Sequence, residues 1–172
     1  MNQRAVFVVD ANVFIEAKNR YYAFLICPGF WDALVWHGGS GVVCSVDLVK
    51  RELLGGNDDL AGWVKTTAPP DAFHTTNDAD AVAWYGRIVN WVQSEPRFKP
   101  EAKAEFAQAA DPWLVAYARA HGMRLVTQET PDPMSRKKVK IPDVCRQFGV
   151  KCANTFEMLE DLGVRFSWQA AS

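Results

Sequence analysis

The feature that most constrains the fold is the first apolar run of the chain. Residues 5–9 (AVFVV) form a short, uninterrupted segment rich in β-branched side chains, and it ends at Asp10. Such a strand suits a position buried on both faces of a parallel sheet. Two similar runs follow at residues 42–46 and 124–129, and helical patterns separate the three. The chain is therefore expected to begin in the centre of its own core.

The segments between these runs predict helices, with turn signals at their ends. Helical spacing or capping residues mark residues 14–22, 28–37, 47–54, 58–63, 78–93, 111–121, 141–148 and 155–162. Loops are expected at residues 68–76 and 130–140, and a last edge strand at residues 150–153. Strands that alternate with helices, without hairpin turns, predict a three-layer α/β/α sandwich with a central parallel sheet. Residues 1–172 are expected to form a single domain.

Composition excludes several classes of protein. The chain carries 19 Lys and Arg against 20 Asp and Glu, a formal charge of −1, so no chain-wide basic field attracts nucleic acid. A polyanion would have to be held locally, by a patch or by a metal. No apolar run reaches the roughly 20 residues that a membrane span needs. The apolar run within residues 1–10 is also too short for a signal peptide. A soluble cytoplasmic protein without membrane contact is therefore expected. The four Cys and three His lack the spacing of a zinc site.

Four acidic residues stand where a sheet of this type collects ligands, at the carboxyl ends of strands. Asp10 ends the first strand, Glu52 lies in the helix after the second, Asp111 opens the helix before the third, and Glu129 ends the third. Each has an ordinary structural explanation: the two Asp as helix caps, Glu52 as a solvated side chain, Glu129 as a loop charge. Brought together, the four would repel and require a proton or a cation. An all-oxygen ligand set selects Mg²⁺ or Mn²⁺.

Three segments carry a family resemblance. VVDANVF, SVDLVKRELL and ADPWLVAYARAHGMRLVTQE resemble, in order and content, the signature segments of PIN-domain ribonucleases, a group that includes the VapC-type toxins of bacterial toxin–antitoxin pairs. The later stretch KVKIPDVCRQFGVKCANTFEMLEDLGV is similar to that of a longer, uncharacterised PIN subgroup. One departure is Glu129, which is longer than the Asp or Asn often found at that position, so its metal contact could run through water.

The resemblance implies an activity and a set of residue roles. It implies Mg²⁺- or Mn²⁺-dependent endonucleolytic hydrolysis of RNA, with Asp10, Glu52, Asp111 and Glu129 as catalytic metal ligands. Asn12 and Thr127 are similar to polar residues that support the acids, although a turn Asn and a strand Thr explain them equally well. The resemblance also implies an antitoxin protein as partner and a homodimer.

The RNA would need positive charge around the acidic pocket. Residues 124–151 carry a net charge of +4, and the loop that contains Arg136, Lys137, Lys138 and Lys140 follows the third strand directly. These four residues are predicted to contact phosphates, the alternative being a solvated charge run. Tyr21 and Tyr22, after the first helix, are open to partner contacts.

Other protein classes share some of these features. A haloacid-dehalogenase-like phosphatase needs a second Asp two residues after the first, where this chain has Asn12, and a receiver domain fits less well. A catalytically silent PIN scaffold that binds RNA or a protein is the remaining alternative. Four retained acidic positions argue against it, because a binding module gains nothing from negative charge near phosphates.

Overall fold

The first strand lies in the centre of a five-stranded parallel sheet, as the sequence predicts. The computed structural model describes residues 6–170 and gives the strand order β3-β2-β1-β4-β5. The strands are β1 (Phe7–Val9), β2 (Val43–Val46), β3 (Phe73–His74), β4 (Arg124–Val126) and β5 (Cys152–Ala153), and all four pairings are parallel. Ala5, predicted to start the first strand, lies outside the described residues, and the single domain over residues 1–172 stays a prediction.

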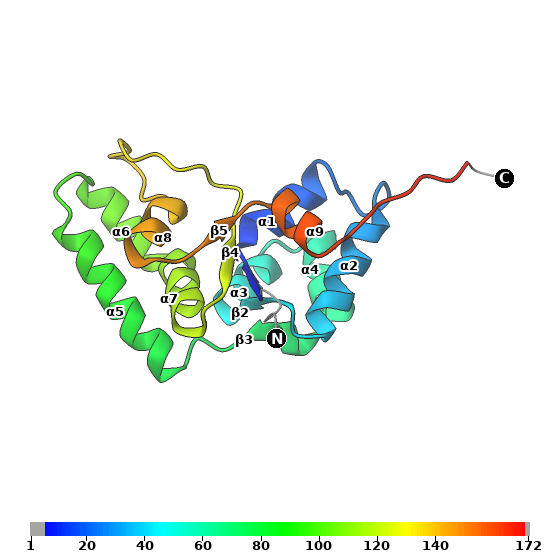
Figure 1. Cartoon of the computed structure of the whole chain (residues 1–172), viewed down its shortest axis with the longest axis horizontal. Helices are drawn as coiled ribbons and strands as arrows, with labels where there is room; N and C mark the ends of the chain where they lie inside the picture. The colour runs from blue at the N-terminus through cyan, green and yellow to red at the C-terminus, as the bar shows by residue number, and fades with distance from the viewer. Residues whose placement is uncertain (1–5, 171–172) are drawn as a thin grey trace.

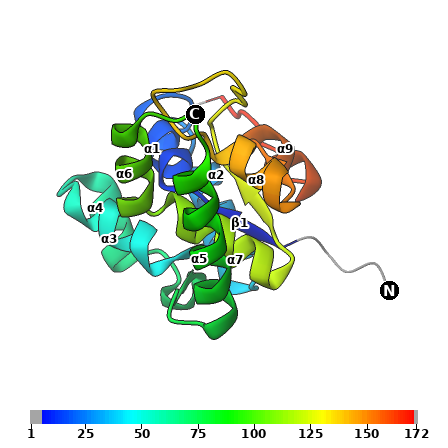
Figure 2. The ribbon, with the colours of Figure 1, turned by 90° about the vertical axis from the view of Figure 1, so that its left-hand side faces the viewer.

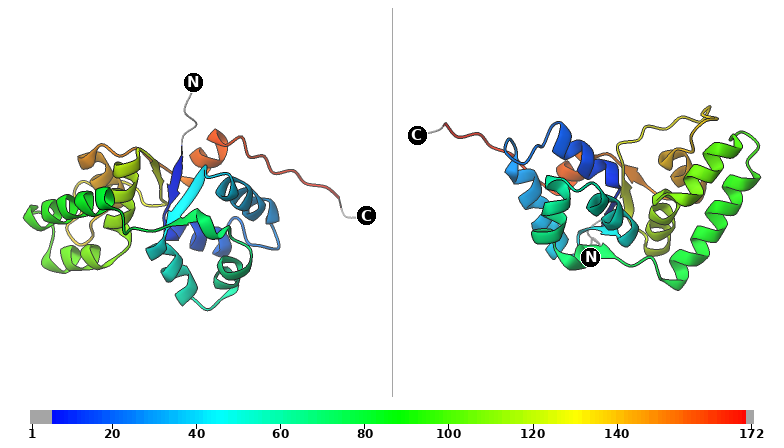
Figure 3. Two further views of the ribbon diagram at one scale, coloured as in Figure 1. Left: turned by 90° about the horizontal axis from the view of Figure 1, so that it is seen from below. Right: turned by 180° about the vertical axis from the view of Figure 1, so that it is seen from behind.

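Helices cover both faces of the sheet. On one side lie α5 (Ala79–Ser94), α6 (Pro100–Gln108), α7 (Asp111–His121) and α8 (Ile141–Phe148), and on the other α1 (Ala11–Asn19), α2 (Pro28–Gly39), α4 (Asp59–Thr66) and α9 (Thr155–Asp161) (Figure 1). Helix α3 (Asp47–Gly55) packs against α1 and α4. Helix α7 contacts β1 and β4 and is itself covered by α5, the helix nearest the viewer in Figure 2. The three-layer α/β/α sandwich is therefore present, and Figure 3 shows its strands between the two helical layers.

Several element boundaries differ from the sequence prediction. Strand β4 ends at Val126, so Glu129 lies in the loop beyond it rather than at the strand end. Asp47 and Asp111 are the first residues of their helices and not the caps, which are Val46 and Ala110. Helix α6 and strand β3 were not predicted. Strand β3 has two residues beside a proline-rich turn, and pairing with β2 defines it more than its own side chains do.

The core is built around β1 and its neighbours. Phe7, Val8 and Val9 are all at most 1% exposed, and Leu125 of β4 and Leu114 of α7 are fully buried beside them. The Ser45 hydroxyl of β2 donates to the Val9 carbonyl oxygen (2.6 Å), so the one polar group of this strand pair is also satisfied. Within the described residues, no helix combines the length and the apolar character that a membrane crossing requires.

Truncating the centre of this core should destabilise the protein strongly. Leu125→Ala removes a fully buried side chain next to β1 and should lower the free energy of unfolding by about 2–5 kcal/mol, because the cavity cannot collapse between two helical layers. Urea denaturation followed by circular dichroism measures the change. Leu25→Ala is the matched control, because Leu25 is 99% exposed, and it should shift the value by less than about 0.5 kcal/mol. Equal effects of the two variants would contradict this account of the core.

Candidate active site

Asp10 is fixed at the carboxyl end of the central strand. Its backbone N–H donates to the carbonyl oxygen of Val126 (2.9 Å), which ties it to β4, and the residue is only 2% exposed. Although Asp10 precedes α1, its side chain caps no helical N–H. The hydroxyl of Thr127 donates to its Oδ2 instead (3.1 Å). Thr127, the residue that follows β4, therefore stabilises the charged carboxylate more than the backbone N–H of Asn12 in its own helix does.

Asp111 approaches the same edge from α7. Because it is the first residue of the helix, its side chain is not in the capping position that the sequence suggested. No hydrogen bond or ion pair from residues 6–170 holds its carboxylate. A partly buried carboxylate without a partner is costly, which argues against a purely structural role for this residue.

The pKa values show that the acids share one site. Burial, then the charges of Glu129 and Glu52, raise the pKa of Asp10 to about 6, against the opposing hydrogen bond from Thr127. Burial and the charges of Asp10 and Glu129 raise the pKa of Asp111 to about 7. The pKa of Glu52 is also raised, by partial desolvation. The structure thus brings the four predicted acids within electrostatic reach of one another, across more than a hundred positions of sequence.

Glu129 differs from the other three because cationic and N–H groups already engage it. Its Oε1 pairs with the Lys138 ammonium (2.8 Å), and its Oε2 accepts a hydrogen bond from the backbone N–H of Ile141 (2.7 Å). The hydrogen bond to Glu129 is also the main reason why the pKa of Lys138 is raised, with Asp111 and Glu105 adding to it. Lys138, predicted as a phosphate contact, is therefore the internal counter-charge of the acidic edge. Glu105 is a further acid that the sequence motifs missed, because it lies on the unpredicted helix α6.

The donor set fits a hard divalent cation in its chemistry. It consists of carboxylate oxygens, and two of the acids have pKa values that are raised first by burial and then by neighbouring negative charge. Within residues 6–170, however, no three Asp, Glu, His or Cys side chains converge closely enough to enclose an ion. A cation such as Mg²⁺, which retains several waters, could bridge carboxylates that are not in direct contact with it.

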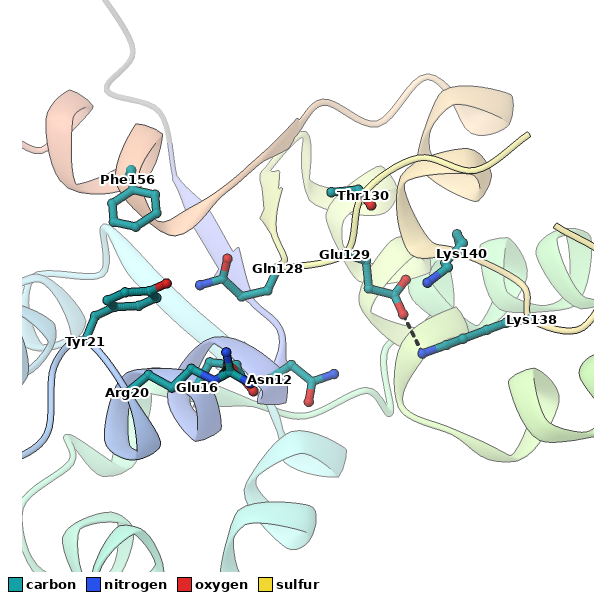
Figure 4. Close-up of a pocket in the computed structure, with 10 residues that line it drawn as sticks. All are labelled: Asn12, Glu16, Arg20, Tyr21, Gln128, Glu129, Thr130, Lys138, Lys140 and Phe156. Atoms are coloured by element: carbon teal, nitrogen blue, oxygen red, sulfur yellow. Dashed lines mark ion pairs between the residues drawn. The ribbon is translucent and has the colours of Figure 1, made fainter. Parts of the chain in front are cut away.

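A cavity of about 450 Å³ opens beside Glu129, the one of the four predicted acids that lines it (Figure 4). Asn12 and Glu129 face it, as do two of the four predicted phosphate contacts, Lys138 and Lys140. Arg136 and Lys137 are exposed farther along the loop and do not line the cavity. The rest of its lining comes from the end of α1 and the segment after it, from the segment after β4 and from α9; of these residues only Tyr21, as a candidate partner contact, was singled out from the sequence. No motif links these segments, so only their packing reveals the cavity.

One known protein family matches almost the whole length of the chain. The family described as "Domain of unknown function (DUF4411)" matches residues 7–166, nearly all of the described chain. The chain belongs to the DUF4411 family. No curated protein sequence matches this DUF4411 chain.

Two solved structures share the fold. A chain of VapBC2 from Rickettsia felis, bound to a DNA fragment from their promoter, is 12% identical, with a TM-score of 0.53 over 87% of this chain and 98% of that one. A chain of FitAcB from Neisseria gonorrhoeae is 16% identical, with a TM-score of 0.55 over 88% and 99%. These likenesses support the PIN-like fold that the motifs predict for this DUF4411 protein. The membership of a longer PIN subgroup stays a prediction.

The raised pKa of Asp111 should make stability depend on pH. The folded state keeps a proton, up to about pH 7, that the unfolded chain releases near pH 3.8. The free energy of unfolding should therefore fall as the pH rises from about 4 to about 7. Asp111→Asn removes the free-energy cost of ionising this buried carboxyl. At pH 8 in cation-free buffer the variant should be more stable than the wild type by roughly 1–3 kcal/mol, because the ionisation of Asp111 is coupled to that of the neighbouring acids. At pH 4 the two proteins should differ little.

Thermal and urea unfolding at pH 4 and pH 8 measure this effect. Asp71→Asn is the control, because Asp71 is an exposed acid in the turn before β3, outside the site. The account would be contradicted if Asp111→Asn raised the free energy of unfolding equally at both pH values, or by no more than Asp71→Asn does. Repulsion among the acids would then not destabilise the fold.

Proposed function

We propose that this protein is a Mg²⁺- or Mn²⁺-dependent endoribonuclease, and that it is the toxin of a type II toxin–antitoxin pair. The observation that carries the proposal is the placement of Asp10 and Asp111 at one edge of the sheet, where both are buried enough to have raised pKa values and the charge of Asp10 adds to the rise for Asp111. Two carboxylates held in this way need a cation or a proton. The motif resemblance to PIN-domain ribonucleases and the PIN-like fold support the same chemistry.

The residues have distinct proposed roles. Asp10, Glu52 and Asp111 would hold the cation directly or through water, and Glu129 would act through water because Lys138 and Ile141 already engage its oxygens. When bound, the cation would lower the pKa of its water and offset negative charge on the phosphate. Thr127 orients Asp10 through its hydroxyl. Asn12, exposed at the cavity beside Glu129, is proposed to support the acids from the substrate side.

Positive charge for the RNA backbone comes from the loop between β4 and α8. Lys138 and Lys140 line the cavity next to the acids, and Arg136 and Lys137 extend the basic surface into solvent. Phosphates that approach the acidic edge would therefore meet cations first, which lowers the repulsion that the carboxylates cause. To contact a phosphate, Lys138 would have to weaken its ion pair with Glu129.

The proposed partners follow from the two likenesses. The motifs resemble VapC-type toxins, and VapBC2, which shares the fold, is described with a fragment of promoter DNA. We infer that an antitoxin protein binds this chain in the cytoplasm and blocks the site. A homodimer is proposed on the resemblance alone.

The nuclease proposal makes a direct prediction for two variants. Asp10→Asn and Asp111→Asn should each lower the rate of RNA cleavage by about a hundredfold or more, because each removes an oxygen ligand at the acidic edge. Cleavage of a labelled RNA pool in Mg²⁺ or Mn²⁺ measures the rate, and EDTA should abolish it. Asp71→Asn should cleave as the wild type does. Cleavage that survives in both site variants would remove the assignment, and a wild type that binds RNA without cleaving it would point to the silent scaffold.

The toxin proposal predicts a growth phenotype. Expression of the wild-type chain alone in a bacterial host should arrest growth, because RNA cleavage would proceed without an inhibitor. The Asp111→Asn variant at equal protein level should leave growth normal. Growth curves with quantified expression decide the matter. If the wild type and Asp111→Asn give identical curves, the chain does not act as a toxin in that host.

A further inference from the structure

The cavity beside the acidic edge has one wall of a different chemical character. Opposite Glu129 stand two aromatic side chains, Tyr21 from the segment after α1 and Phe156 from α9 (Figure 4). Their ring centroids lie 6.3 Å apart at an interplanar angle of 64°. Tyr21 is 67% exposed and Phe156 54% exposed, so neither ring is part of the core. An edge-to-face pair of this kind keeps ring faces available for a ligand.

Polar groups lie between the aromatic pair and the acids. Gln128 occupies this position, and its amide nitrogen donates to the hydroxyl of Thr155 (2.9 Å), which fixes the side chain. A fixed amide provides a directional hydrogen-bonding group at the cavity floor. The cavity volume falls within the range of about 300–1,000 Å³ that small-molecule sites occupy, so there is space for one nucleotide unit.

The charged side chains that line the cavity leave one cation available for a phosphate. Arg20 pairs with Glu16 (2.8 Å) and Lys138 with Glu129 (2.8 Å), so these four lining charges offset one another. Lys140 also lines the cavity, and no residue of the described chain forms an ion pair with it. The surplus charge is therefore positive, close to exposed aromatic faces. Aromatic faces with nearby cations are the combination that binds unpaired bases and their phosphates.

We propose that Tyr21 and Phe156 form a stacking subsite for one unpaired base of the RNA, next to the phosphate that reaches the acidic edge. The inference rests on the proposed function and names its substrate class: RNA that is single-stranded at the cleavage point. A base within a duplex has both faces covered by its neighbours and cannot stack on these rings without leaving the helix. The subsite therefore excludes continuous duplex RNA, whereas loops and unpaired ends can enter. Gln128 provides hydrogen bonding to the base edge.

Binding can be separated from cleavage by working in the Asp10→Asn background. A single-stranded RNA oligonucleotide that carries 2-aminopurine should lose fluorescence on binding, because the base stacks on an aromatic ring. Tyr21→Ala and Phe156→Ala should each weaken binding roughly five- to a hundredfold and reduce the quenching. Tyr21→Phe should retain both, since it keeps the ring. Trp36→Ala is the control, because Trp36 is 76% exposed on α2 and does not line the cavity.

Cleavage by the otherwise wild-type enzyme gives the second readout. Single-stranded RNA should be cut and a matched duplex should not, and Tyr21→Ala and Phe156→Ala should lower kcat/KM on the single strand while thermal unfolding stays unchanged. If Asp10-dependent cleavage occurs but these variants match Trp36→Ala in binding, quenching and cleavage, the proposed subsite is wrong while the nuclease function stands. If quenching depends on both rings but the wild type cuts no RNA, the subsite stands and the proposed nuclease function fails.

Discussion

The parallel pairing of β1 on both of its edges is the constraint on which the site depends. Because β2 and β4 flank this strand, the acid at its end has little access to water, and its backbone is tied to Val126. Thr127 then fixes the carboxylate with a hydrogen bond. A second acid, Asp111, reaches the same edge from α7. The pairing that buries β1 therefore also buries Asp10, whose charge adds to the raised pKa of Asp111.

The structure compensates this charge only in part. Lys138 and the Ile141 N–H engage Glu129 directly, whereas Asp111 feels the charge of Lys138 without forming an ion pair or a hydrogen bond within the described chain. A fold selected for stability alone would replace such an acid with a neutral or apolar residue. Local conflicts of this kind are expected at functional sites, where chemistry and not packing determines the side chain. The conflict is thus a physical argument for function that does not depend on family resemblance.

The sequence predicts the common location of the four acids better than it predicts the segments around them. Asp10 could be placed because a buried apolar run has one clear end, and the parallel sheet then determines which other acids share its edge. Strand β3 and helix α6 were not predicted, because their sequence patterns are weak and tertiary contacts define them. The contact between Tyr21 and Phe156 could not be predicted for a different reason. The two residues are 135 positions apart with no periodic relation, and only the docking of α9 beside α1 brings the rings together.

The order of the strands also has a consequence during protein synthesis. Asp10 leaves the ribosome early, but Thr127, which orients it, and Asp111 belong to the second half of the chain. Strand β4 inserts beside β1 only after more than a hundred intervening residues have been made. Nascent chains that end before β4 consequently lack the complete acidic edge. Translation itself therefore delays the appearance of the proposed activity until the segment that carries Asp111, Thr127 and Glu129 has emerged.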